Sequence, residues 1–329
     1  MERVTAGGHR YSDPDVLALI REGGALADPR SLVLTQARRL NQQYRTFDSP
    51  GVTPFERLVY IASLIGLEVK AMDNSRRRDQ NRDAVILLSG ASKGRRGQIF
   101  YNPDRPRGRV AFSVAHEISH TFFPPTSGGA RFREICGSDS REANELERLC
   151  DLGASEVLMP VEEFRSAAGG DWSMRAVSRL SEKFGASFEA TTFRLASAHP
   201  GIAAAGLLKY RRRKEEQRTA ERVEAGKAQG SLFSRATLSA AIIPEPKYRR
   251  QSFHTSEDFP ERLTVRWNKS FDEDSIVYRA ANSATALQHK ESLPNGSATL
   301  GRLEVVAAPY QREDADPNHP DLLFFWAAP

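Results

Sequence analysis

The chain has only two cysteines, Cys136 and Cys150, among its 329 residues. Two cysteines are too few for a disulfide framework, so we expect buried or half-buried thiols in a reducing compartment. No apolar run reaches the roughly eighteen residues that a membrane span needs, and Met1 to Gly8 contain no apolar core of a signal peptide. The sequence therefore predicts neither export nor membrane insertion, and we expect a cytoplasmic protein.

Apolar residues make up 40% and aromatic residues 9% of the chain, which is enough to build ordinary hydrophobic cores. The length exceeds the usual single-domain range, so two or three domains are expected. The net charge of +5 is compatible with a nucleic-acid partner without requiring one. The short basic clusters at residues 76–78 and 211–214 border polar segments, and we expect solvated loops or helix ends there, with phosphate contact as the alternative.

The most informative motif is His116-Glu117-Ile118-Ser119-His120, which follows an apolar run at residues 110–115. On one helix, positions i and i+4 project to the same side about one turn apart. His116 and His120 can therefore present two imidazole nitrogens to one metal ion. The pentapeptide is a signature of zinc hydrolases, in which Glu117 would be the general base.

A zinc hydrolase needs a third protein ligand and leaves one coordination position for water. His199 is the nearest later histidine, but it lies far downstream with no supporting pattern. Residues 142–160 are rich in helix formers and end at a proline, which predicts a second helix. Glu147 and Asp151 share one face of that helix.

These motifs resemble the ImmA/IrrE family of metallo-endopeptidases. The family pairs an A-H-E-x-x-H helix with a second helix that reads E-x-x-A-[ND] and ends in L-M-P; here residues 112–120 are followed by Glu147-x-x-Cys150-Asp151 and by Leu-Met-Pro at 158–160. The resemblance covers roughly residues 50–165.

The resemblance implies that Glu147 is the third ligand of a Zn²⁺ ion, with Mn²⁺ as the alternative metal, and that Asp151 holds one of the two histidine rings. Cys150 stands where the family usually has alanine, and Gly153 is smaller than the usual aromatic residue nearby. Neither departure falls on a ligand position, although the second helix can pack differently because of them. Because Cys150 lies one turn from Glu147, a redox-sensitive thiol close to the metal is the alternative to a simple buried thiol.

The function implied by the resemblance is that of an intracellular zinc endopeptidase that cleaves a specific regulatory protein, such as a transcriptional repressor in a stress response. The alternative is a non-catalytic, metal-bound regulator that sequesters a repressor or binds DNA. Glu117 favours catalysis, because metal binding alone would not need it. Direct DNA binding rests only on the net charge and on a pair of predicted helices, and the residue that stabilises the oxyanion is unassigned.

The expected fold class is α+β, with a gluzincin-like metallopeptidase domain that contains a small β-sheet and the motif helix, followed by a helical pair and a β-rich C-terminal domain. The expected boundaries are an N-terminal helical extension at 1–45, the peptidase domain with a helix-turn-helix-like pair at 46–200, a charged linker or helix at 201–230 and the β-rich domain at 231–329.

Local patterns predict individual elements within these domains. Helices are expected at 31–44 and from Thr53, which is followed by Pro54 at the first helical position and by an acidic first turn. Two strands that form a hairpin are expected at 85–88 and 98–101, and strands of the C-terminal domain at 263–267, 276–278, 303–306 and 322–326.

Overall fold

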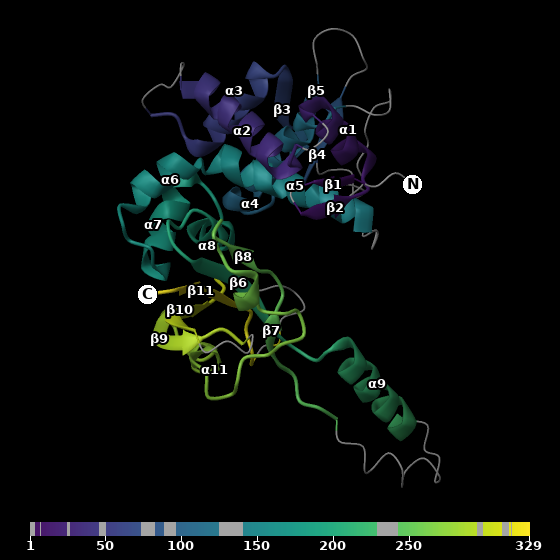
Figure 1. Cartoon of the computed structure of the whole chain (residues 1–329), viewed down its shortest axis with the longest axis vertical. Coiled ribbons are helices and arrows are strands. Elements are labelled where there is room, and N and C mark those ends of the chain that lie inside the picture. The colour runs from purple at the N-terminus through teal and green to yellow at the C-terminus, as the bar shows by residue number, and fades with distance from the viewer. Residues whose placement is uncertain are drawn as a thin grey trace. The chain divides into compact units, whose positions relative to one another are not determined.

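The structure is a computed structural model with helices and sheets throughout, which confirms the predicted α+β class (Figure 1). None of the helices in the described part of the chain is long and apolar enough to span a bilayer. The described residues are 4–6, 8–24, 27–45, 51–73, 83–88, 97–124, 141–228, 243–294, 299–310, 316 and 318–329, with only the backbone at 141–144 and 226–228.

The chain divides into two compact units. Unit 1 comprises Met1–Gly169 and Arg179–Ala190, and unit 2 comprises Gly170–Ser178 and Thr191–Pro329. The finer domain limits expected from the sequence stay a prediction.

Unit 1 contains both parts of the sequence motif. Its elements up to residue 169, in chain order, are β1 (Val4–Ala6), β2 (His9–Tyr11), α1 (Pro14–Gly23), α2 (Pro29–Arg45), α3 (Pro54–Leu64), β3 (Leu67–Ala71), β4 (Ala84–Leu88), β5 (Gly97–Tyr101), α4 (Arg107–Ser119), the 3-10 turn η2 (His120–Phe122), α5 (Arg141–Leu158) and α6 (Val161–Ala168).

Helix α3 begins as the sequence predicts, with a reciprocal cap. The Thr53 hydroxyl accepts a hydrogen bond from the Glu56 N–H at 3.3 Å, and the Glu56 carboxylate accepts one from the Thr53 N–H at 2.7 Å. This capping box satisfies donors that the first helical turn leaves without partners. After the helix, Gly66 has a φ of 75°, a left-handed conformation that glycine adopts readily.

The small sheet of unit 1 has the strand order β3-β5-β4. Strand β4 pairs antiparallel with β5 in a register that sets Ile86 opposite Ile99, which confirms the predicted pairing of these strands. Strand β3 pairs parallel with β5. Helix α4 packs on β4 and β5 and buries Val114 and Ile118 completely. The sheet is therefore the support of the motif helix.

Helix α5 is tied to the N-terminal segment near both of its ends. Near its start, the Glu145 carboxylate accepts hydrogen bonds from the backbone N–H groups of Ser12 at 2.9 Å and Asp13 at 3.2 Å. Near its end, the Asn41 side-chain amide donates to the Glu156 carbonyl oxygen at 2.9 Å. These bonds fix α5 against α2 and against the segment that leads into α1.

Arg57 joins three helices of unit 1. Its guanidinium donates to the Glu163 carboxylate and to the Asn41 side-chain oxygen, both at 2.9 Å, and lies 5.1 Å from the centre of the Tyr44 ring. Burial acts to raise the pKa of Glu163, but hydrogen bonds and charges from Arg57 and Arg45 outweigh it, so that pKa is lowered. The pair of arginines thus stabilises an ionised carboxylate between α2, α3 and α6.

The expected helical pair is present as α7 (Met174–Phe184) and α8 (Phe188–Ser197). Gly185, with a φ of 60°, lies in the turn that joins them. The boundary between the two units passes through this pair.

Unit 2 is built around an antiparallel sheet with the strand order β7-β6-β11-β10-β9, in which β8 also pairs with β6. Every residue of the central strand β11 is buried. The elements of unit 2 that follow α8 are β6 (Ala203–Arg211), α9 (Lys214–Ala228), β7 (Lys247–Arg250), β8 (His254–Thr255), the 3-10 turn η3 (Glu261–Leu263), α11 (Ile276–Ala280), β9 (Leu287–Ser292), β10 (Leu300–Ala307) and β11 (Leu322–Ala327).

The predicted strands at 303–306 and 322–326 are confirmed as parts of β10 and β11, but the prediction for 263–267 is wrong. That segment leaves η3 and continues irregularly, with Leu263 and Val265 buried in the core and Trp267 exposed. Alternating burial along an irregular segment produces the same sequence pattern as a strand.

The predicted strand at 276–278 is also wrong, because these residues begin the short helix α11. The Ser275 side chain accepts a hydrogen bond from the Val277 N–H at 3.2 Å and caps the helix. Only five residues form this helix, too few for a helical period to be visible in the sequence.

Strand β6 was not predicted, although it lies beside the central strand β11. Its sequence begins Ala-Ala-Ala-Gly and then Leu-Leu, and alanine and leucine favour helix. The strand is stabilised by pairing and burial rather than by local preference.

The basic cluster at 211–214 is only partly solvated. The Arg211 guanidinium donates to the Arg250 carbonyl oxygen at 3.2 Å and lies 4.6 Å from the centre of the Trp267 ring. Arg211 is therefore structural, which corrects the expectation of a solvated cluster at this residue. The cluster at 76–78 lies outside the described residues.

Replacing Arg57 by alanine should destabilise unit 1 by about 2 kcal/mol, because hydrogen bonds to charged groups contribute roughly 1.5–3 kcal/mol. Arg45→Ala removes another partner of Glu163, but Arg45 is 53% exposed whereas Arg57 is 17% exposed, so the loss should stay below about 1 kcal/mol. Thermal unfolding of both variants checks this, and equal losses would contradict it.

Candidate metal centre

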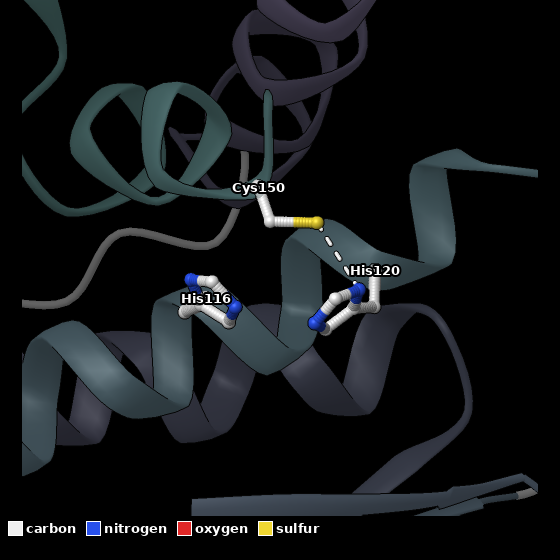
Figure 2. Close-up of side chains that lie close together, drawn as sticks. All are labelled: His116, His120 and Cys150. Carbon is white, nitrogen blue, oxygen red and sulfur yellow. Dashed lines mark hydrogen bonds between the residues drawn. The ribbon is translucent and has the colours of Figure 1, made fainter. Parts of the chain in front are cut away.

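The two motif histidines lie on one side of α4 (Figure 2). His120 is the first residue after the helix and keeps helical dihedral angles, with φ −60° and ψ −23°, so the four-residue spacing still brings the rings together. Their centres are 4.8 Å apart. Both imidazoles are largely removed from solvent, which limits their orientations.

Helix α5 brings the Glu147 carboxylate to the same point. One oxygen lies 3.0 Å from Nε2 of His116, and the other lies 3.9 Å from Nε2 of His120. Nitrogen and oxygen ligands at ~2.0–2.2 Å from a tetrahedral zinc ion lie roughly 3.3–3.6 Å from one another. The Glu147 carboxylate therefore lies close enough to both imidazoles to be a candidate third ligand of one small divalent cation.

The distal nitrogen of each ring has its own contact with α5. Nδ1 of His116 lies 2.9 Å from an Asp151 carboxylate oxygen, and Nδ1 of His120 lies 3.1 Å from the Cys150 sulfur. Figure 2 shows the Cys150 side chain directed from α5 toward the His120 ring. When both Nδ1 atoms carry the proton, both Nε2 lone pairs face Glu147 and can bind a metal.

The sequence predicts His116, His120, Glu147 and Asp151 as site residues, and the structure brings them together. The contact of Cys150 with His120 was not among the predictions. The available signal was the position of Cys150 three residues after Glu147, which puts both side chains on one face of α5. Among the described residues, the group whose possible ligand atoms all lie within 4.8 Å of one another consists of His116, His120 and Cys150 and does not include Glu147.

The electrostatic field at the site favours a cation. Burial acts to lower the pKa of His116, but hydrogen bonds to Asp151 and Glu147, together with the charges of Asp151 and Glu117, raise it to about 10. Carboxylates that stabilise a proton on His116 so strongly would also stabilise a divalent ion at this point.

Glu117 lies next to the first histidine on α4 and is buried. Its charge is one of those that act on His116. A carboxylate in a buried position costs free energy unless the surroundings compensate for it. Its position next to His116 in the sequence and the effect of its charge on that imidazole are compatible with proton transfer in the site.

Helices α4 and α5 approach closely because residue 153 is a glycine. A Cβ atom added to Gly153 would lie 2.8 Å from the Ser119 hydroxyl oxygen and 3.1 Å from a ring carbon of Phe122. Both distances are shorter than ordinary van der Waals contacts. The small residue noted in the sequence therefore allows α5 to pack tightly against the end of α4.

Gly153→Ala should force the two helices apart and weaken metal binding. Overpacking costs about 1–3 kcal/mol, and the higher helix preference of alanine recovers at most ~1 kcal/mol. The expected results are a lower melting temperature and a lower metal affinity, measured by calorimetry on the full chain. In a Ser119→Ala background, which removes the nearest atom, the loss should be smaller; an equal loss would show that this contact does not set the helix distance.

Comparisons with known proteins agree with the motif. Residues 62–196 match the family model of the IrrE N-terminal-like domain, Peptidase_M78. Among curated proteins no match is found. Of the solved structures, 11 chains match; one is a Mycobacterium tuberculosis transcriptional regulator with 15% identity and a TM-score of 0.47, over 91% of this chain and 80% of that one. That likeness is too loose to indicate function. Residues 62–196 thus match the IrrE N-terminal-like domain of the M78 peptidase family, which agrees with the resemblance of the motifs to the ImmA/IrrE family.

Proposed function

We propose that the protein is a zinc-dependent endopeptidase with a gluzincin-type centre, in which His116, His120 and Glu147 hold the metal. The observation that carries the proposal is the position of the Glu147 carboxylate, 3.0 Å and 3.9 Å from the Nε2 atoms of the two histidines. Three nitrogen and oxygen donors that leave one position open are typical of catalytic zinc sites. Manganese is the alternative ion, since such donors select a metal partly by availability.

The side chains of this site would divide the chemistry among them. A zinc ion bound here would lower the pKa of its water ligand toward ~7 and would polarise the scissile carbonyl group. Glu117 accepts the proton of the attacking water and later delivers it to the leaving amine. Asp151 accepts the Nδ1–H of His116, which fixes the tautomer and the direction of that ring.

The proposed substrate is a regulatory protein, such as a transcriptional repressor whose cleavage releases genes of a stress response. Support for this substrate comes from the family to which residues 62–196 belong. Catalysis is favoured over simple metal binding by the buried Glu117, whose charge acts on His116. A protein that only sequesters a partner would gain nothing from this side chain.

Glu117→Gln separates the enzyme from a metal-bound scaffold. The substitution keeps the size of the side chain and all three proposed ligands, so metal content and melting temperature should stay unchanged. Losing a positioned base should slow cleavage by ~10²–10⁴-fold. The measurement is a comparison of new protein N-termini in cells that carry wild type or Glu117→Gln, with fragments that appear only with wild type.

The matched control is Glu162→Gln, the same change at an exposed position of α6, which should cleave as wild type does. If cells with Glu117→Gln induce the genes of the stress response as fully as wild type, catalysis is dispensable. Sequestration of the repressor or DNA binding would then replace cleavage as the proposed function.

A further inference from the structure

Two consecutive residues of α5 contact the two histidines on the side away from Glu147. Asp151 contacts Nδ1 of His116 and Cys150 contacts Nδ1 of His120, at 2.9 Å and 3.1 Å. The single carboxylate of Glu147 faces Nε2 of both rings. Helix α5 therefore meets each imidazole at both of its nitrogens.

We propose that Cys150 is a positioning residue, whose sulfur accepts the Nδ1–H of His120 and holds Nε2 of that ring toward the metal. The inference rests on the proposed metal centre but not on peptidase activity. A ligand imidazole usually donates its other N–H to an acceptor, which fixes its tautomer and orientation. Asp151 is such an acceptor for His116, and Cys150 would be the corresponding acceptor for His120.

The surroundings of Cys150 suit this role. The thiol is fully buried, and the His120 side chain is only 7% exposed, so bulk water has little access to the contact between them. A sulfur atom is a weak acceptor, yet a weak hydrogen bond gains in strength where the local dielectric is low. A 3.1 Å separation is short for a contact to sulfur, whose hydrogen bonds extend well beyond the usual N–H···O distance.

The alternative to this proposal is that Cys150 is itself a ligand of the metal. The sulfur lies at Nδ1 of His120, whereas the Glu147 carboxylate lies at Nε2. These nitrogens are on different edges of the ring, so a metal held by Nε2 and Glu147 has the imidazole between it and the sulfur. The geometry therefore favours Cys150 as the support of a ligand over Cys150 as a ligand.

The test is Co²⁺ affinity, measured on full-length protein by competition with a chelator, together with the visible absorption of the bound Co²⁺. Losing an outer partner of a ligand typically costs ~10–100-fold in affinity. Cys150→Ala should fall at the lower end of that range, near tenfold, because sulfur is a weak acceptor, and its spectrum should change. Asp151→Ala, which loses a carboxylate, should lose more.

Cys150→Ser supplies an acceptor oxygen at the same position and should recover most of the affinity and the wild-type spectrum. Val157→Ala, a buried change two turns along α5, is the control for simple loss of packing and should leave affinity and spectrum unchanged.

Three outcomes would overturn the proposal. They are an unchanged affinity in Cys150→Ala, a Cys150→Ser variant as weak as the alanine variant, and a sulfur-to-cobalt charge-transfer band in wild type that Cys150→Ala removes. Absence of Co²⁺ binding by wild type would contradict the whole metal centre. Metal binding without cleavage would contradict only the peptidase function.

Discussion

The packing of α5 against α4 is the interaction on which the candidate centre depends. Two histidines on one helix bind a metal only weakly unless a third ligand comes from another element. The candidate for that ligand is Glu147 of α5, whose carboxylate lies 3.0 Å from Nε2 of His116. The helix distance is set by Gly153, which leaves room for the Ser119 side chain. The site is therefore a consequence of helix packing as much as of the motif itself.

The rest of unit 1 fixes the two helices at this distance. Helix α4 lies on the small sheet, while α5 is held near its two ends by the hydrogen bonds of Glu145 and of the Glu156 carbonyl group. Metal ligands must be held in place before the ion binds if affinity is not to be lost in ordering them. Bonds far from the histidines thus contribute to the pre-formed arrangement of the donors.

Much of the candidate site could be predicted from sequence, because helical spacing fixes which side chains share a face. His116, His120 and Glu147 follow from that rule and from family resemblance. The contact of Cys150 with His120 could not be predicted, since it depends on how two helices face each other. In unit 2, strand β6 and helix α11 were not predicted, because their local sequences favour other structures. Strand β6 depends on its long-range pairing with β11, and helix α11 depends on a single serine cap.

The central claim is that the metal is held by two histidines and a carboxylate, with sulfur outside the coordination sphere. X-ray absorption at the zinc edge of the loaded full-length protein tests it most directly. The account predicts only nitrogen and oxygen neighbours at ~2.0–2.2 Å, with the scattering pattern of two imidazole rings. A sulfur neighbour at ~2.3 Å that disappears in Cys150→Ser would contradict it, because Cys150 would then be a ligand and not a support of His120.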